Sequence, residues 1–285
     1  MRYHPLKFSA AHPARPLARA AWVAVLATSA LACTAAPAAP AVRPGTAPPL
    51  VFAFAELSPW LNHEGAAYTG AYAEIMRELA RRLGRRLDIQ PCPLKRCLAM
   101  LEGGTADVGI GLKENPERAA YLHFLHASYR HGVADRVFWV RRGDADRIRR
   151  YEDLAGLRIG VVASGAYFAR FDADSGIDKE IAQGNEANLR KLVLGRLDAV
   201  LIPEDQALVL LHRLDLQGKL EAAKFRVQDL APRSIAVARS SAAVHLLPQM
   251  EAAMTAMRRD GTLAAIYDRH YYKHYGVSRQ QIKVD

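Results

Sequence analysis

The sequence lacks the short motifs that mark the commonest enzyme classes. It contains no Gly-x-Ser-x-Gly elbow, no phosphate-binding loop and no His-Glu-x-x-His pair. Its ten histidines are dispersed, and the densest group, His123, His126 and His131, has no Cys, Asp or Glu beside it at ligand spacing. We interpret these histidines as partly exposed polar positions, and we expect no catalytic residue, no metal site and no cofactor.

Long apolar runs are also scarce. The run from Ala20 to Ala32 is about as long as the core of a signal peptide and too short to span a bilayer. The segment before it has no acid and four bases, Arg2, Lys7, Arg15 and Arg19. No later run approaches about eighteen apolar residues. We therefore expect residues 1–41 to be a signal peptide and leader, and the 244 residues after Ala41 to be exported to the periplasm.

The end of the signal allows two kinds of processing. Its "ALACTAAPAAPA" tail offers several Ala-x-Ala sites for plain cleavage. Cys33 also stands where a lipidated cysteine would, although Ala30 replaces the large aliphatic residue usual in that motif. Plain cleavage and a lipid anchor at Cys33 both remain open.

A concentrated basic surface is missing as well. Removal of the four signal bases leaves 35 Lys and Arg against 29 Asp and Glu. The basic residues are scattered through helix-like runs such as "RELARRLGRR", and aromatic residues do not alternate with them. This pattern is typical of solvated helix faces and argues against nucleic acid as a partner.

Cysteine is rare, with three residues in the chain. Since Cys33 belongs to the signal region, Cys92 and Cys97 form the one remaining pair, and an oxidising compartment favours a disulfide between them. A metal site would need two further ligands, and a thioredoxin-like centre would need Cys-x-x-Cys; we keep both as weaker alternatives. A disulfide over so short a loop adds little chain-entropy stability and serves mainly to fix the corner between a strand and a helix.

Strand-like and helix-like runs alternate after an Ala/Pro-rich leader at residues 35–49. In the first half the patterns predict strands over 50–57, 85–94 and 106–112 and helices over 71–84 and 95–104, with a loop over 58–70 and an irregular run over 121–132. Such alternation implies a parallel sheet with crossover helices, whose ligand crevice lies at the carboxyl ends of the strands.

A second alternating series of strand-like and helix-like runs follows in the second half of the chain. Strands are predicted over 136–142, 157–164 and the end of 185–203, with helices in the stretch after 164, at the start of 185–203 and over 204–215. A strand over 233–239 then leads into two terminal helices, 243–261 and 263–276. Two similar lobes account for this order.

Four motifs in sequence carry a resemblance: "LDIQPCPLKRCLAMLEGGTADVGIGLKENPER", "LAGLRIGVVASGAYF", "LGRLDAVLIPED" and "MEAAMTAMRRDGTLAAIYDRHY". Their arrangement, over residues 50–275, resembles solute-binding protein family 3 of amino-acid ABC transporters, with the type II periplasmic-binding fold. The resemblance implies an α/β fold of two lobes joined by two crossover strands, with lobe 1 at 48–132 plus 240–285 and lobe 2 at 133–239. The chain would leave the first lobe near Gly132 and return near Arg239.

The resemblance also implies a site. Arg118 in "ENPER" matches the arginine that grips the solute carboxylate, a role that suits a guanidinium with two parallel donors; otherwise it is a surface residue. Gly111 and Leu112 match strand-end residues that offer backbone groups. Lys113 stands where a hydroxyl is common, and either adds positive charge for a solute with two acids or points outward. Trp60 lies beside the pocket or packs the core.

In the second half, Ser164, Gly165 and Ala166 match a Gly-rich turn whose N–H groups meet the anionic end of the solute, and Tyr167 follows. Ala166 lacks the hydroxyl often found there. Members that bind α-amino acids place an Asp about five residues after the motif aspartate, here Asp198, and this Asp pairs with the ammonium of the solute. Pro203 stands at that position. Glu204 either replaces that Asp or caps the following helix, so a carboxylate without an α-amino group remains open.

We therefore expect a monomeric, non-enzymatic periplasmic protein that captures a small, amino-acid-like carboxylate by hinge closure and delivers it to the membrane permease of an ABC importer. One alternative is a periplasmic dehydratase of the cyclohexadienyl or arogenate type, with Glu204 as acid/base near Arg118. The other is a sensory binding lobe without transport. The sequence leaves the identity of the solute open.

Overall fold

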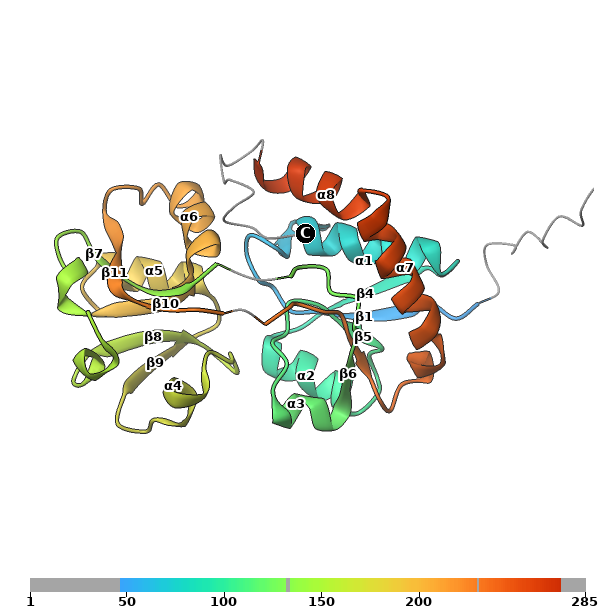
Figure 1. The fold of residues 1–285 in the computed structure, drawn as a ribbon, viewed down its shortest axis with the longest axis horizontal. Coiled ribbons are helices and arrows are strands. Elements are labelled where there is room, and N and C mark those ends of the chain that lie inside the picture. The colour runs from blue at the N-terminus through green and yellow to red at the C-terminus, as the bar shows by residue number, and fades with distance from the viewer. Residues whose placement is uncertain (1–46, 132–133, 230, 273–285) are drawn as a thin grey trace, which may run out of the picture. The chain divides into compact units, whose positions relative to one another are not determined.

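The computed structural model describes residues 47–131, 134–229 and 231–272. These residues form two groups of strands and helices, which we call the first and second lobes (Figure 1). Several predicted features lie outside the described residues: the predicted signal peptide with Cys33, the predicted leader up to residue 46, the exit point Gly132 and the end of the second terminal helix. No helix among the described residues is long and apolar enough to cross a membrane.

The first lobe takes its elements from both ends of the chain. Its strands are β1 (Leu50–Phe54), β4 (Leu87–Pro91), β5 (Val108–Gly109), β6 (Leu122–Phe124) and β12 (Ala236–Ala238), with a separate hairpin of β2 (Asn62–Glu64) and β3 (Ala67–Thr69). Its helices are α1 (Ala71–Arg82), α2 (Leu94–Glu102), α3 (Pro116–Tyr121), α7 (Leu247–Arg259) and α8 (Thr262–Tyr267). The sheet order is β4-β1-β5-β12-β6.

The second lobe is continuous in sequence. Its strands are β7 (Arg136–Arg141), β8 (Arg158–Val162), β9 (Asp178–Ala182), β10 (Ala199–Pro203) and β11 (Leu220–Val227), in the order β11-β7-β10-β8-β9. Its helices are α4 (Ala169–Ala173), α5 (Asn185–Val193) and α6 (Glu204–Arg213). The predicted α/β fold with two lobes is therefore confirmed.

Both sheets are mixed, where the sequence predicted a parallel sheet. Strand β1 pairs parallel with β4 and β5, but β12 runs antiparallel to β5 and β6. In the second lobe β8 pairs parallel with β9 and β10, whereas β7 is antiparallel to β10 and β11. The antiparallel strands are those next to the connections between lobes.

The return to the first lobe comes earlier than predicted. Because β12 pairs with β5 and β6, the chain has already rejoined the first sheet before Ala236, and the predicted return near Arg239 is wrong. The two connections meet in a short antiparallel bridge between Arg130 and Arg233. The backbone N–H of Arg233 donates to the carbonyl of Arg130 at 2.8 Å, and that of Tyr129 donates to the carbonyl of Arg233 at 2.8 Å.

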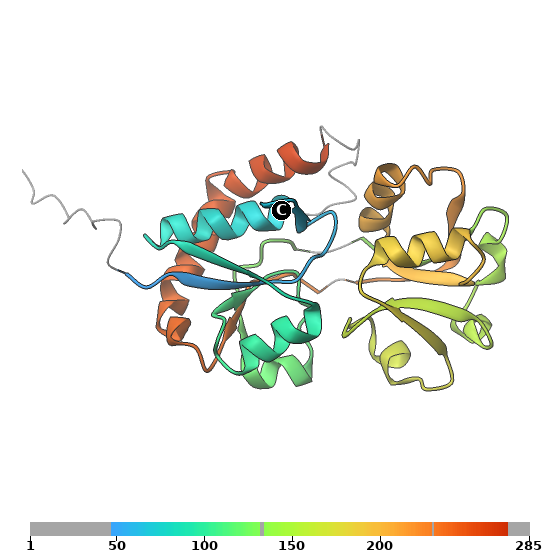
Figure 2. The same ribbon diagram turned by 180° about the vertical axis from the view of Figure 1, so that it is seen from behind.

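Helix α1 illustrates how the first core forms. Its buried residues recur at helical spacing, including Ile75, Met76 and Leu79, and pack with methionines of α7 such as Met250 and Met254. Helices α1, α7 and α8 lie on one face of the sheet, and α2 and α3 lie on the other (Figures 1 and 2). Burial of these side chains contributes about 2 kcal/mol each, which holds the strands in place.

The second sheet is also covered on both faces. One core gathers Phe138, Phe171 and Leu201 with neighbours from the α4 side. The other gathers Leu189, Leu210 and further side chains of α5 and α6. Strands β7 and β10 are buried along most of their length, as expected for strands with helices on both faces.

Candidate functional site

A cavity of about 1020 Å³ is lined by residues of both lobes. In the first lobe it meets the segments after β1 and β5 and the start of α2; in the second it meets the segments after β8 and β10 and the start of α6. These are the carboxyl ends of parallel strands, where open α/β sheets place their ligands. The cavity is large enough for a small organic solute.

Gly111 lines the cavity just beyond β5 in a conformation that suits glycine. Its φ is +82°, and a Cβ atom there would lie 2.8 Å from Cδ2 of Leu57. Its N–H donates to the hydroxyl of buried Tyr129 at 3.1 Å. That N–H is therefore occupied within the protein. Leu112, which follows it, also lines the cavity.

Arg118 lines the cavity and is 5% exposed. Helix α3 positions it: Pro116 is the first helical residue, and the side chain of Asn115 accepts a hydrogen bond from the Arg118 N–H at 2.8 Å. The guanidinium donates to the carbonyl of Lys113 at 2.8 Å and, in the second lobe, to the carbonyl of Ser164 at 3.0 Å. Burial lowers the pKa of Arg118, but a guanidinium stays protonated.

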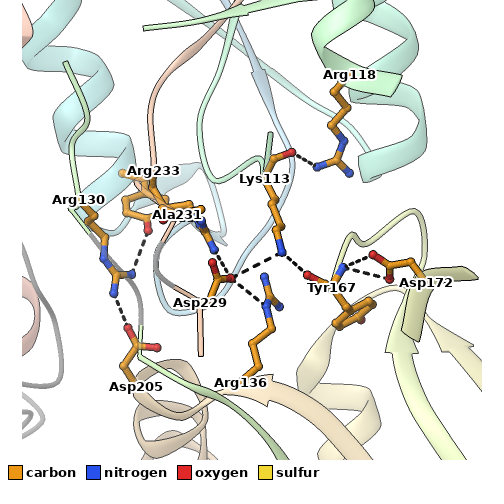
Figure 3. A network of polar contacts seen from close by, with 11 residues as sticks. Lys113, Arg118, Arg130, Arg136, Tyr167, Asp172, Asp205, Asp229, Ala231 and Arg233 are labelled. Carbon is orange, nitrogen blue, oxygen red and sulfur yellow. Dashed lines mark hydrogen bonds and ion pairs between the residues drawn. The ribbon is translucent and has the colours of Figure 1, made fainter. Parts of the chain in front are cut away.

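Lys113 points inward, towards the second lobe, and not outward (Figure 3). Its Nζ donates to the carbonyl of Tyr167 and lies 3.9 Å from Oδ2 of Asp229. Burial lowers the pKa of Lys113; Asp229 raises it, and Arg136 and Arg233 lower it further. Lys113 therefore adds positive charge to the cavity.

The predicted turn after β8 reaches the same cavity. Ser164 has a positive φ of 58°, and the Gly165 N–H donates to the Val162 carbonyl at 2.9 Å. The hydroxyl of Tyr167 accepts from the Val162 N–H at 2.6 Å, which links Tyr167 to the end of β8. Within the described part of the chain, the N–H groups of Ser164 and Ala166 have no hydrogen-bond partner. Gly165, Ala166 and Tyr167 line the cavity.

A charged cluster that the sequence did not predict lies beside these residues (Figure 3). Oδ2 of Asp229 accepts from Nε of Arg136 at 3.0 Å and from Arg233 at 2.6 Å. All three side chains are less than a tenth exposed. Burial raises the pKa of Asp229, but Arg233, Arg136 and Lys113 together outweigh it and hold the pKa below its ordinary value of 3.8.

The two acids at the start of α6 have different surroundings. Glu204 forms a bidentate pair with Arg226, at 2.7 and 3.1 Å, and does not line the cavity. The prediction that Glu204 belongs to the binding site is therefore not supported by its position. Asp205 does line the cavity; it is fully buried and pairs with Arg130 at 2.7 Å. The Asp205 contact again joins the two lobes.

Trp60 both packs in the core and lines the cavity, the two positions that the sequence left open. It packs in the first core, stacked on Tyr72 at 5.6 Å and edge-on to Tyr271 at 4.4 Å, and it also lines the cavity. The guanidinium of Arg130 lies 4.9 Å from its ring centre. The cation over this Trp is therefore a residue of the chain itself.

Cys92 and Cys97 form the predicted disulfide, with 5.4 Å between their Cα atoms. Cys92 follows β4 and Cys97 lies in the first turn of α2, so the bond fixes the strand-to-helix corner. Cys92 lines the cavity, together with Lys95 and Arg96 of α2. The disulfide thus supports one wall of the cavity.

The described residues that line the cavity carry far more positive than negative charge. The cations are Lys95, Arg96, Lys113, Arg118, Arg130, Arg136 and Arg233. The carboxylates are Glu56 and Asp205. Such a lining attracts anions.

Outside the cavity, His123 and His126 are joined by Glu251 of α7, with ligand atoms within 4.8 Å of one another. His131 is not part of this group. The Glu251 carboxylate accepts from the backbone N–H groups of His126 and Ala127, at 2.7 and 2.9 Å. These bonds account for its position without an ion.

Comparison with known proteins agrees with this architecture. The sequence profile of "Bacterial extracellular solute-binding proteins, family 3" matches residues 53–273. The L-cystine-binding protein TcyJ of Escherichia coli K12 is 24% identical over 229 residues, which cover 80% of each chain.

Solved structures share the fold at low identity. An ancestral arginine-binding protein bound to arginine has a TM-score of 0.66 and 23% identity, over 78% of this chain and 96% of the other. A periplasmic His/Glu/Gln/Arg/opine family-binding protein from Silicibacter pomeroyi, in complex with lysine, has a TM-score of 0.65 and 20% identity, over 80% and 99%.

Proposed function

Because the chain belongs to family 3 of the bacterial extracellular solute-binding proteins, we propose that it captures a small carboxylate-bearing solute in the cavity and delivers it to the permease of an ABC importer. The observation that carries this proposal is the position of Arg118: buried, lining the cavity, and in contact with both lobes. The relatives named above bind amino acids, so an amino-acid-like carboxylate is the natural starting class.

Arg118 supports carboxylate capture by its geometry. Its two terminal nitrogens donate to backbone carbonyls, which are neutral acceptors that a carboxylate can replace with a gain in charge complementarity. The N–H groups of Ser164 and Ala166 on the opposite wall supply further donors within the described residues. A carboxylate held between these groups would touch both lobes at once.

Capture of this kind works by hinge closure. The solute stabilises the closed arrangement only to the extent that it binds that arrangement more tightly than the open one. Contacts from Arg118 to Ser164 and from Arg130 to Asp205 already join the lobes, and the two connections between lobes lie next to the cavity. A solute that adds bonds to both sides therefore favours closure.

We also propose that the protein is not an enzyme. The dehydratase alternative needs an acid/base near Arg118, and Glu204 was its candidate. Glu204 pairs with Arg226 and does not line the cavity, while Asp205 is held by Arg130. Neither carboxylate is available for proton transfer to a solute.

Export completes the proposal. The family is extracellular by its description, and the basic segment followed by the apolar run before residue 33 is typical of a signal peptide. We propose that the folded part acts in the periplasm, with or without a lipid anchor at Cys33.

The test is a thermal-shift screen of the purified exported protein against amino acids, polyamines and small organic acids, because a solute that binds only the folded state raises the unfolding midpoint. Arg118→Ala should abolish the shift given by the best solute, with an unliganded midpoint close to the original. Arg118→Lys should restore it in part, since the bidentate geometry is lost.

Arg149→Ala is the matched control, because Arg149 is exposed and pairs with Asp146 away from the cavity. It should bind the solute normally. Normal binding by Arg118→Ala as well would disconnect this arginine from solute capture and refute the proposal.

A further inference from the structure

Positive charge exceeds negative charge in the ion pairs around Asp229. Lys113, Arg136 and Arg233 surround one carboxylate, Asp229, and their three ion pairs with it all reach the same oxygen, Oδ2. One negative charge cannot neutralise three positive ones. Buried charge that lacks a counter-charge is costly, so this cluster is poised to accept additional negative charge.

Arg136 shows where that charge would bind. It is 8% exposed and lines the cavity, and its Nε is the atom bonded to Asp229. Among residues 47–131, 134–229 and 231–272, its two terminal nitrogens have no hydrogen-bond partner. A bidentate donor pair is therefore left for an anion.

Arg118 also lacks a paired carboxylate among the described residues, since Glu117 and Asp172 offset the lowering of its pKa by burial only through attraction, without a direct contact. It forms no ion pair within the described part of the chain and bonds only to two carbonyl oxygens. The carbonyl that accepts one of these bonds belongs to Lys113, whose Nζ reaches the Asp229 cluster. Lys113 therefore lies between two positions that can bind an anion, Arg118 and the cluster around Asp229 (Figure 3).

A partner for an ammonium group is much less evident. Pro203 has no charge, Glu204 faces Arg226 and Asp205 is neutralised by Arg130. Glu56, an exposed residue after β1, is the one remaining carboxylate among the described residues that line the cavity. The carboxylate of a zwitterionic amino acid would be attracted by the basic lining. Its ammonium group would be repelled by most of the same residues.

Resting on the solute-capture function proposed above, we infer that the solute is a small dianion. One carboxylate binds at Arg118, and a second anionic group binds at Lys113 and Arg136, beside Arg233. That second group can be a carboxylate, a phosphonate or a sulfonate, because each presents oxygens to the same donors. No ammonium is required.

The experiment measures the affinity of the purified protein for matched probes by titration calorimetry. Succinate, glutarate and adipate are compared with butyrate, pentanoate and hexanoate, which have the same chain lengths and one carboxylate. Glutamate is compared with glutarate to isolate the amino group. 3-Phosphonopropionate and 3-sulfopropionate, with inorganic phosphate and sulfate as controls, distinguish the chemistry of the second group.

At least one dianion should bind about tenfold or more tightly than its matched monoanion, since a second charge-assisted bond is gained. Glutamate should bind no more tightly than glutarate. The inference is overturned if glutamine, arginine or lysine binds more tightly than every dianion, or if no dianion binds at millimolar concentration.

Variants provide an independent check. Lys113→Gln should weaken binding of the best dianion about tenfold and change binding of its monoanion little. Lys224→Gln makes the same charge change at an exposed residue that does not line the cavity, and should change neither. Glu56→Gln should leave dianion binding intact or strengthen it. A tenfold loss in Glu56→Gln would reveal an ammonium partner and contradict the inference.

These outcomes separate the two proposals. If glutamine, arginine or lysine binds more tightly than every dianion and its binding depends on Arg118, solute capture is preserved and the dianion inference is excluded. No binding by any probe or amino acid would refute both.

Discussion

Glu204 and Asp205 are neighbours of the same charge at the start of α6, yet they differ in what their loss should cost. Glu204 is about a third exposed and pairs with the exposed guanidinium of Arg226. Asp205 is fully buried, accepts from Arg130 at 2.7 Å, and receives the N–H of Gln206 at 2.8 Å. Removal of one buried partner leaves an uncompensated charge, whereas water solvates the partner of a surface pair.

Asp205→Asn should lower the free energy of unfolding by about 3 kcal/mol, because Arg130 would remain buried without its counter-charge. Urea denaturation of the two purified proteins measures this difference. A loss below about 1 kcal/mol would mean that solvent reaches Arg130.

Glu204→Gln is the matched control and should cost no more than about 1 kcal/mol, since its ion pair lies at the surface. Its solute affinity should stay within about twofold of the original, because the side chain does not line the cavity. A loss of about a hundredfold in affinity would restore Glu204 to the binding site.

Helix α1 is stabilised at its carboxyl end by a cluster around Glu78. Its carboxylate accepts from Arg81 at 2.7 Å and from Arg82 at 2.7 Å, and Arg82 also pairs with Asp260 at the end of α7 at 2.8 Å. The hydrogen bond from Arg81 is the largest cause that lowers the pKa of Glu78 from 4.5 to about 2. This cluster therefore joins two helices of the first lobe.

The lowered pKa of Glu78 predicts a pH dependence of stability. A carboxylate whose folded pKa lies below its unfolded value stabilises the fold above pH 4.5, and that contribution is lost as the pH falls towards about 2. Glu78→Gln should reduce the decrease in unfolding free energy between pH 5 and pH 3, whereas Glu102→Gln at the exposed end of α2 should not. Identical slopes for Glu78→Gln and the original protein would disprove the contribution.

Helix α2 depends on its disulfide in another way. Loss of both cysteines in Cys92→Ala/Cys97→Ala should lower the unfolding free energy by no more than about 2 kcal/mol, the small chain-entropy value for so short a loop. Solute affinity should fall as well, since the bond holds the start of α2 against the cavity. If stability falls while solute affinity is unchanged, the disulfide contributes to folding and not to solute binding.

Local patterns in the sequence predicted most of the elements but not the charged cluster. The strands around Phe54, Gly109 and Val162 have apolar patterns that the core requires, and they were predicted. Helix α3, strand β6 and the hairpin of β2 and β3 were not predicted, because they are too short to show a period. Strands β9 and β11 were missed because they lie at sheet edges, where exposed charged residues hide the apolar pattern. The partners Arg136 and Asp229 lie 93 residues apart, and Arg130 and Asp205 lie 75 apart, so no local pattern predicts them.

Closure of the two lobes should be visible in amide hydrogen exchange. Addition of the solute found by thermal-shift screening should slow exchange in both walls, at 111–118 of the first lobe and at 162–167 of the second. The exposed turn at Gly143, which does not line the cavity, serves as an internal control and should not change. Protection of one wall alone would indicate binding to a single lobe without closure.

The bridge between Arg130 and Arg233 restricts how the protein can move. A single connection between the lobes would allow them to bend and also to twist relative to each other. Two connections that lie side by side and share backbone hydrogen bonds resist torsion, and bending about one axis remains. If the proposed closure follows that single axis, each closing movement brings Arg118 to the carbonyl of Ser164 in the same orientation.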